Sequence, residues 1–433
     1  MTTPWAAGPT LFVPGDLRAS TWARGFGRSV AELDPMNHEP LEIHGRIAAR
    51  PDRGGTLITG GSGFLGARIV RQLLDGDRRQ SVYVASRRPG ALTESLRRMV
   101  GTVETLRYML DERLVMIPVD MSGDDACGAI VRHVGGARIR TVMHLAAAVD
   151  AFAPRQRLAP ANETATRNAI AVAAAKGARL VHASTLSVFV SSDMDGEDEE
   201  TSLRKRPERM LFGGYAQSKA VADMLVEDAL AAGVDACSVR LGLLVPEDAS
   251  GMEPKSFLKV FHDALVEVGC VPATSEEALI DLTPVDQAAA VMLAVADADE
   301  IPVFVHYANP TSASLSLLAN AILGPVPEIV DDGEWNRRQE TLPSIARTVL
   351  QAAFNKSMFL SSRCATLPIA NADLFQSTAR RYDVSTAIAI GAPIPRSPET
   401  ASAALFVRPD KGNSGTDGAR MPEGMDENGR KRR

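Results

Sequence analysis

The stretch TLITGGSGFLG, residues 56–66, decides the fold. Its apolar start is typical of a β-strand, and a helical pattern follows its last glycine. Gly60 permits a tight turn, Gly63 lets the backbone approach a pyrophosphate, and Gly66 lets the helix pack closely on the strand. The N–H groups and the positive dipole end of that helix then face the phosphates. The stretch therefore predicts a dinucleotide-binding turn, and a glycine-rich turn that binds no ligand is the alternative.

Further strand-length runs follow the same pattern along the chain. Together with the first they are Thr56–Thr59, Ser81–Ala85, Val115–Val119, Thr141–His144, Leu180–Ser184, Cys237–Leu241 and Val303–His306. Helix-length patterns lie between most of them, such as those at residues 67–74, 164–175 and 215–231. Strands that alternate with helices form right-handed crossovers and a parallel sheet covered on both faces. The predicted fold class is therefore α/β, a Rossmann-type doubly wound parallel sheet with a smaller C-terminal substrate lobe.

The same patterns divide the chain into four expected parts. Residues 1–53 form an N-terminal extension or linker, as a docking arm or as a partly ordered cap. Residues 54–245 form the Rossmann domain that binds the dinucleotide. Residues 246–407 mainly form the substrate-binding lobe, with a strand near 303–306 that returns to the sheet. Residues 408–433 are polar and glycine-rich, so burial cannot offset their ordering entropy and we expect a disordered tail.

Composition and charge exclude several kinds of partner. The chain has 433 residues, 45% of them hydrophobic, and a net charge of -6. This charge provides no electrostatic footprint for nucleic acid or for an anionic membrane. No apolar run reaches the roughly 18 residues of a membrane span, and the N-terminus lacks the pattern of a signal peptide. The four cysteines form no CxxC motif, so no metal site is expected, and we expect a cytoplasmic protein.

The ends of the second to fourth strands carry candidate cofactor contacts. Arg87 follows the second strand about 20 residues after Gly66, where an acidic residue would bind the ribose of NAD. An arginine there favours the 2′-phosphate of NADP, and a solvated surface arginine is the alternative. Asp120 ends the third strand as an acceptor for the adenine amino group or as a turn former. Small residues at 146–148 let the backbone lie against the cofactor, and His144 is expected to be a packed residue without chemistry.

A tyrosine and a lysine are the candidate catalytic pair. Tyr215 and Lys219 stand four residues apart at the start of a helical pattern, which places both side chains on one face. A nearby ammonium is expected to lower the pKa of the phenol, and it can also hold the nicotinamide ribose. The preceding strand brings Ser184 and Thr185 to the carboxyl edge of the sheet. We expect Thr185 to bind the substrate carbonyl, with Ser184 as the next candidate; a turn cap is the alternative for either hydroxyl.

These residues together resemble the extended short-chain dehydrogenase/reductase family. Within it they are most similar to thioester reductase domains, which terminate nonribosomal peptide synthetases and carboxylic acid reductases and are related to fatty acyl-CoA reductases. The stretches that carry the resemblance are TLITGGSGFLGARIVRQLL, RLVMIPVDMS, VMHLAAAVD, HASTLSVF, GGYAQSKAVADMLV and LIDLTPVDQAA. The resemblance covers about residues 55 to 310 and, more weakly, the chain to about residue 405.

The resemblance implies a reaction and a set of site residues. The reaction is the NADPH-dependent reduction of an acyl thioester, held by a carrier protein or by coenzyme A, to an aldehyde. Catalysis is implied for Thr185, Tyr215 and Lys219. The implied contacts of NADPH are Gly60, Ser62, Gly63, Phe64, Leu65, Gly66, Arg87, Arg97, Asp120, Met121, Ala146, Ala147, Ser184, Tyr215 and Lys219.

The sequence also departs from the family pattern. Asp150 stands where the family usually has asparagine, and residues 162–166 lack the usual glycine. The stretch Arg240-Leu241-Gly242 lacks the proline that usually follows the arginine. These changes leave the redox core intact, but they weaken the inference that the chain acts on the family's usual substrate. Since no adenylation or carrier domain precedes the reductase in this sequence, we expect a free-standing, diverged member.

Other functions fit parts of the same pattern. A sugar-nucleotide epimerase or dehydratase usually reads SSxxVYG, whereas this chain has Phe189 in place of the tyrosine. A 3β-hydroxysteroid-type dehydrogenase is a further enzymatic alternative. A non-catalytic NADP-sensing regulator would keep the glycine turn but lose Tyr215 and Lys219. The acyl group, the choice between aldehyde and alcohol product, and the oligomeric state stay open.

A basic cluster is the candidate docking site for an acidic carrier protein. Arg204, Lys205, Arg206 and Arg209 lie between the strand of Thr185 and the helix of Tyr215. Complementary charge would guide a carrier to this loop. The alternative is a solvated loop that balances the acidic run at residues 193–200.

Overall fold

The structure of the protein is a computed structural model. It describes residues 27–44, 47–76, 80–150, 153–189, 201–211, 213–246, 257–273, 279–308, 312–324 and 326–354. All of these belong to one compact unit. The expected disordered tail at 408–433, the acidic run at 193–200 and Cys364 lie outside the described residues.

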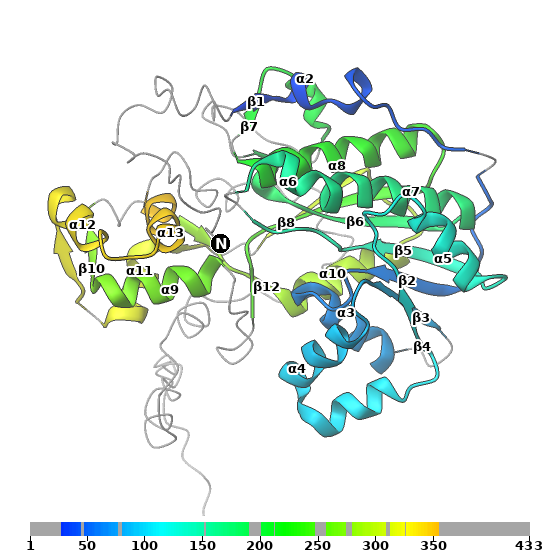
Figure 1. The fold of residues 1–433 in the computed structure, drawn as a ribbon, viewed down its shortest axis with the longest axis horizontal. Helices are drawn as coiled ribbons and strands as arrows, with labels where there is room; N and C mark the ends of the chain where they lie inside the picture. The colour runs from blue at the N-terminus through cyan, green and yellow to red at the C-terminus, as the bar shows by residue number, and fades with distance from the viewer. Residues whose placement is uncertain are drawn as a thin grey trace, which may run out of the picture. The chain divides into compact units, whose positions relative to one another are not determined.

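The seven predicted strands form one seven-stranded parallel sheet, which lies between helices in Figure 1. Its order is β13-β8-β6-β5-β2-β3-β4, and every neighbouring pair is parallel. The strands are β2 (Gly55–Thr59), β3 (Val82–Ser86), β4 (Leu114–Pro118), β5 (Ile139–His144), β6 (Arg179–Thr185), β8 (Ala236–Leu241) and β13 (Phe304–Tyr307). Each coincides with a predicted run to within about two residues. The expected Rossmann-type sheet is confirmed, including the strand that returns from the C-terminal half of the chain.

Helices cover both faces of this sheet (Figure 1). One face packs on α3 (Phe64–Asp75), α4 (Gly90–Met109) and α10 (Val285–Asp297). The other packs on α5 (Ala126–Val134), α7 (Ala165–Lys176) and α8 (Gly214–Ala231). Successive side chains of a strand point to opposite faces, so Leu57 lies in one core and Ile58 in the other. Burial on both faces explains why the strands are continuous apolar runs rather than alternating ones.

The strand order reverses between β2 and β5, which opens a crevice at their carboxyl ends. The turn after β2 meets the backbone after β5 at this point. Gly60 has φ +71°, and a Cβ on it would lie 2.5 Å from the Ala146 nitrogen. A side chain is therefore excluded there for both conformational and steric reasons.

The C-terminal part of the described chain has a separate hydrophobic core. The helices that build it are α9 (Phe257–Val268), α11 (Leu315–Leu323), α12 (Asp332–Arg338) and α13 (Ser344–Phe354). Two short strand pairs lie in the same part of the chain: β10 (Cys270–Pro272) pairs with β15 (Glu328–Val330), and β11 (Leu279–Asp281) pairs with β14 (Ser312–Ser314). The rings of Trp335 and Phe354 meet edge to face there, with centroids 5.2 Å apart. The short pair β9 (Leu244–Val245) with β12 (Thr283–Pro284) links this part of the sequence to α10. Its assignment as the substrate lobe stays a prediction.

Part of the expected N-terminal linker is folded. β1 (Arg28–Ser29) pairs with β7 (Met210–Leu211), and α2 (Val30–Leu33) and a 3₁₀ turn (Pro35–Asn37) follow. Arg204 donates to Asp34 at 2.7 Å and also pairs with Glu227 and Asp228 at 2.9 Å. These ion pairs hold the N-terminal segment on the C-terminal half of α8.

The proposed basic docking cluster is therefore not an exposed patch. Arg204 is occupied by three carboxylates. Arg209 is buried, and its guanidinium lies over the ring of Phe189 at 5.3 Å. Lys205 is exposed and Arg206 half-buried. The prediction of a four-residue docking surface is wrong for Arg204 and Arg209, because both stabilise the fold instead.

None of the helices within the described ranges is long and apolar enough to cross a membrane.

Candidate active site

The turn between β2 and α3 is shaped for a pyrophosphate. Gly63 precedes the first residue of α3 and offers no side chain to cap the helix. A Cβ on Gly66 would overlap the carbonyl oxygen of Gly60, so the helix starts as close to the strand as the backbone allows. Since the N-terminus of α3 has a positive dipole end and its N-cap residue makes no side-chain hydrogen bond, this turn fits a dinucleotide. Ser95 on α4 donates to the carbonyl oxygen of Ser62 at 2.6 Å and steadies the turn.

Two of the predicted nucleotide contacts lie beside each other at the ends of β3 and β4. The Arg87 guanidinium is 3.9 Å from the Asp120 carboxylate, and the Arg87 side chain is 69% exposed. Asp120 also accepts hydrogen bonds from the hydroxyl and the backbone nitrogen of Ser122, and these bonds lower the pKa of the Asp120 carboxyl. The same bonds form a turn, which was one of the two roles expected for Asp120. Met121 is buried, and its carbonyl accepts from Asn168 at 2.9 Å.

Arg97, in contrast, is engaged on its own helix. Its guanidinium binds both oxygens of Glu94 at 2.9–3.2 Å, with the side chain half exposed. The prediction that Arg97 contacts a phosphate requires this ion pair to open.

A buried polar chain fixes the backbone after β5. Thr166 donates to the carbonyl of Asn162 at 2.6 Å, so its hydroxyl must accept from Nε2 of His144 at 3.1 Å. Nδ1 of His144 then accepts from Thr59 at 2.7 Å, and the Thr59 oxygen accepts from the nitrogen of Ala146 at 3.3 Å. Burial lowers the pKa of His144 to about 3, so the ring is neutral. His144 thus positions Ala146 beside Gly60 through hydrogen bonds.

Asn162 connects the same backbone to the helix of the catalytic pair. It lies in a π-helical turn, Pro160–Thr164, between α6 (Arg155–Ala159) and α7. Its side chain binds both the nitrogen and the carbonyl of Ala148, at 2.7 and 3.1 Å, and donates to Ser218 at 2.9 Å. Ser218 in turn donates to the carbonyl of Tyr215. Sequence reasoning quoted this asparagine only as part of a departing motif, although a π-turn is a common mark of a functional site.

Thr185 and Tyr215 lie together at the carboxyl edge of the sheet. Thr185 is the last residue of β6, and its hydroxyl contacts that of Ser187 at 2.8 Å. Burial raises the pKa of Tyr215 to about 12, and the nearby Thr185 hydroxyl offsets only part of the rise. The expected lowering of the phenol pKa is therefore wrong, because desolvation dominates; the phenol is a proton donor at neutral pH.

Lys219 lies one turn further along α8 and is buried. Its Nζ donates to the carbonyl of Ala183 at 2.7 Å and lies 3.0 Å from Nε2 of His182. Burial lowers the pKa of Lys219 to about 8, against a raising effect from Asp223. Sequence reasoning missed His182, because a histidine inside a strand gives no sign of which helix lies over it. The hydroxyl of Ser184 is buried and has no hydrogen-bond partner among the described residues.

Asp223, one turn after Lys219 on α8, forms a second contact that the sequence did not predict. It accepts from the Arg240 guanidinium at 2.8 Å, and both side chains are fully buried. The rings of Phe304 and Phe189 lie 3.9 and 4.9 Å from the same guanidinium. Arg240 thus ties α8 to β8 below the catalytic pair.

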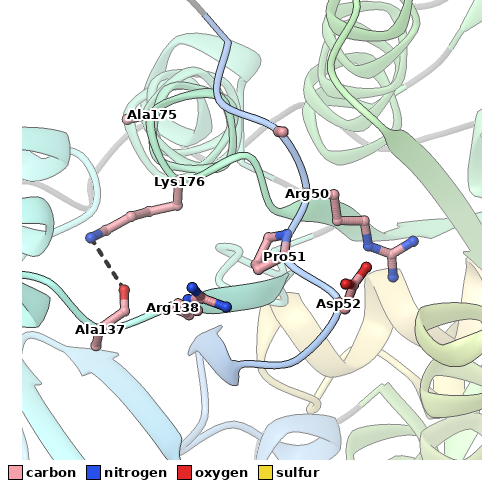
Figure 2. A pocket seen from close by; sticks show the side chains of 8 residues that line it. Arg50, Pro51, Asp52, Ala137, Arg138, Ala175 and Lys176 are labelled. Carbon is pink, nitrogen blue, oxygen red and sulfur yellow. Dashed lines mark hydrogen bonds between the residues drawn. The ribbon is translucent and has the colours of Figure 1, made fainter.

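A shallow pocket of about 400 Å³ lies elsewhere, at the amino ends of β5 and β6 (Figure 2). Its lining comes from residues 49–52, Ala137, Arg138, Ala175 and Lys176. Lys176 there donates to the carbonyl of Ala137 (Figure 2). Since Tyr215 and Thr185 lie at the carboxyl edge, this pocket is separate from the candidate site. Within the described ranges, no group of three or more His, Cys, Asp and Glu residues is placed to hold a metal ion.

Comparison with known proteins identifies related chains. The family model described as male sterility protein, an NAD-binding family, matches residues 58–292. The isonitrile lipopeptide synthase of Streptomyces coeruleorubidus is 30% identical over 297 residues, which are 66% of this chain and 19% of that protein. One of the polypeptides of the linear gramicidin synthase of Brevibacillus parabrevis is 32% identical over 53% of this chain and 5% of its own length. The chain therefore spans about a fifth or less of these relatives.

Solved structures share the fold. The terminal R domain of the myxalamid PKS-NRPS pathway superposes with a TM-score of 0.66 at 21% identity, covering 83% of this chain and 94% of that domain. A thiolation-reductase di-domain from an archaeal nonribosomal peptide synthetase gives a TM-score of 0.65 at 19% identity, with 79% and 75% covered.

The glycine turn generates the first testable prediction. Gly66→Ala should weaken nucleotide binding at least roughly tenfold, because α3 must move away from the Gly60 carbonyl to admit the methyl group. Gly90→Ala is the matched control, since a Cβ at this helix-starting glycine meets nothing within 4 Å. Titration of NADPH fluorescence measures both. Unchanged affinity in the Gly66 variant would contradict the role of the turn.

Proposed function

Because the chain belongs to the NAD-binding family described as male sterility protein, and is thus an oxidoreductase of the extended short-chain dehydrogenase/reductase type, we propose that it reduces an acyl thioester to an aldehyde with NADPH. The observation that carries this proposal is the placement of Thr185 and Tyr215 at one edge of the sheet, beside the buried Lys219. All three come from elements that end or begin at the edge of the sheet where the glycine turn lies.

The preference for NADPH rests on the residues after β3. Arg87 is largely exposed, and the carboxylate of Asp120 is 3.9 Å from it and already accepts from Ser122. A guanidinium held this loosely is available to a 2′-phosphate, whereas an acidic residue for the ribose of NAD does not occupy this position.

The chain's own residues polarise and protonate the substrate. The bound cofactor would supply a hydride to the carbonyl carbon of the substrate. Thr185 and the protonated phenol of Tyr215 are two adjacent hydroxyls that donate to the carbonyl oxygen as it becomes negative. Tyr215 then gives its proton to that oxygen, and Lys219 steadies the phenolate that remains. The resulting thiohemiacetal breaks its carbon–sulfur bond, which yields an aldehyde and a free thiol.

An acyl thioester is the substrate class best supported by the relatives. Two relatives are a lipopeptide synthase and a component of linear gramicidin synthase, and one solved structure joins a thiolation domain to a reductase. We extend this association to the present chain as part of the proposal: the acyl group is presented on the thiol of a carrier protein or of coenzyme A.

The alternatives are less well supported. A regulator that only senses NADP has no use for an assembled Thr185, Tyr215 and Lys219. Many epimerases and dehydratases of this superfamily read SSxxVYG, with a tyrosine where this chain has Phe189. The Phe189 ring packs at 4.9 Å from the buried Arg240 guanidinium.

Removal of the phenol hydroxyl tests the catalytic role. Tyr215→Phe keeps the ring but removes the proton donor, so hydride transfer to a thioester should fall by roughly 10²-fold or more while NADPH affinity is retained. Tyr108→Phe is the matched control, because that hydroxyl binds Asp75 between α3 and α4 and should not affect turnover. Near-normal turnover in the Tyr215 variant would remove it from the mechanism.

The arginine after β3 tests the choice of cofactor. Arg87→Ala should weaken NADPH binding by about 1.5–3 kcal/mol, the range for a hydrogen bond to a charged group, and leave NADH binding nearly unchanged. Arg107→Ala, which removes an exposed arginine paired with Asp75 and Glu104, should affect neither. Equal losses for NADPH and NADH would show that Arg87 does not bind the 2′-phosphate.

A further inference from the structure

His182 is a buried histidine that the mechanism above does not use. It lies within β6, is 1% exposed, and places Nε2 3.0 Å from Nζ of Lys219. Its ring stacks on that of His144, with centroids 5.2 Å apart and planes 25° from parallel. His144 is itself fixed by Thr59 and Thr166. The orientation of His182 is therefore set by the interior of the protein and not by solvent.

The protons at this contact are assigned by the chemistry of the two groups. An ammonium has three N–H donors and no acceptor. Burial, followed by the charge of Lys219, lowers the pKa of His182 well below its usual value, so the ring is neutral. A neutral imidazole has one bare nitrogen, and Nε2 must be that nitrogen to accept from the ammonium of Lys219. The proton then lies on Nδ1, which has no partner among the described residues.

We propose that His182 is a positioning residue for Lys219: its Nε2 accepts a hydrogen bond from the ammonium, so that Lys219 stays charged and aimed at the site while buried. The relevance of this contact to catalysis rests on the proposed function. The Ala183 carbonyl accepts a second hydrogen bond from Lys219, and one N–H remains for the phenol or the nicotinamide ribose. Without His182, the buried ammonium of Lys219 would have the Ala183 carbonyl as its one acceptor on β6.

The other charged and titratable groups around Lys219 do not replace this acceptor. Asp223, one turn further along α8, is bound to Arg240 of β8 at 2.8 Å. His144 of β5 uses both ring nitrogens for threonines. Burial keeps Tyr215 protonated by raising its pKa, so its hydroxyl is a donor. Loss of the His182 acceptor should therefore lower the pKa of Lys219 further, since a hydrogen bond to the charged form favours that form.

The direction of the pH effect follows from this assignment. The pKa of Lys219 is about 8, so its charge is present below that pH and is lost as the pH rises through it. If the ammonium is required, activity has an alkaline limb governed by this pKa. Removal of the acceptor should move the limb toward lower pH by about one unit, the size expected for one hydrogen bond to a buried charge.

Two amide variants of His182 separate positioning from packing. His182→Gln places a carbonyl oxygen near the position of Nε2, whereas His182→Asn places it near Nδ1, out of reach of Lys219. Both are neutral and polar, so neither introduces a charge or an apolar side chain beside Lys219. His182→Phe removes the acceptor but keeps a ring to stack on His144. Ser238→Ala is the matched control, because this buried hydroxyl on the adjacent strand has no partner among the described residues.

The experiment measures the pKa of Lys219 directly. The chain has eight lysines, so the side-chain carbons of carbon-13-labelled lysine give few NMR signals, and Lys219→Met assigns the one of interest. The expected pattern is a pKa near that of the wild type in the Gln and Ser238 variants, and one about a unit lower in the Asn and Phe variants. Thermal unfolding confirms that each variant is folded, and if Asn fails, the Phe and Gln pair decides. Equal pKa values in the Gln variant and its acceptor-free partner would overturn the proposal.

Parallel rate measurements keep the two proposals distinct. The alkaline limb of thioester reduction should move with the pKa of Lys219 in each variant. If the wild type transfers no hydride to any thioester, the proposed function fails, yet the NMR titration still decides the role of His182. If thioesters are reduced but the pH of the alkaline limb is the same in all variants, the positioning role of His182 is wrong and the proposed reaction is retained.

Discussion

The close approach of two backbone segments at the switch point of the sheet is the constraint on which the site depends. Gly60 turns with a positive φ and leaves no room for a Cβ beside the Ala146 nitrogen. Gly66, in the first turn of α3, lies directly against the Gly60 carbonyl. Together these contacts place an uncapped helix N-terminus at the carboxyl edge of a parallel sheet, where the dipole favours an anion. The predicted catalytic residues lie at the ends of elements of the same sheet.

A row of buried polar residues connects this turn to the catalytic helix. Thr59, His144 and His182 lie side by side on neighbouring strands, and Lys219 reaches the last of them from α8. Buried polar groups are expensive unless paired, so such a row fixes side chains that an apolar core would leave free to shift. The Asp223–Arg240 pair anchors α8 one turn further on. The buried polar residues of this sheet therefore orient the site residues as well as stabilise the fold.

Much of the fold followed from local patterns. The seven strands and the helices α3, α7 and α8 coincide with predicted segments because period and turn residues are local properties. The glycine turn and the adjacency of Thr185 to Tyr215 were predictable because strand ends share one edge of a parallel sheet. Charge could not be interpreted in the same way: Arg204 belongs to a basic run, yet it is bound by Asp34, which is 170 residues away. The shift of the Tyr215 pKa and the contact of Lys219 with His182 likewise depend on burial and long-range packing, which spacing does not reveal.

Thioester reduction is tested most directly by supplying the protein with NADPH and a panel of acyl thioesters, loaded on a carrier protein or on coenzyme A. NADPH oxidation is followed optically, and the products are identified by mass spectrometry. The account predicts that at least one thioester yields its aldehyde and a free thiol in step with NADPH consumption. A protein that instead retains tightly bound NAD through purification, and oxidises no NADPH with any thioester, would contradict it.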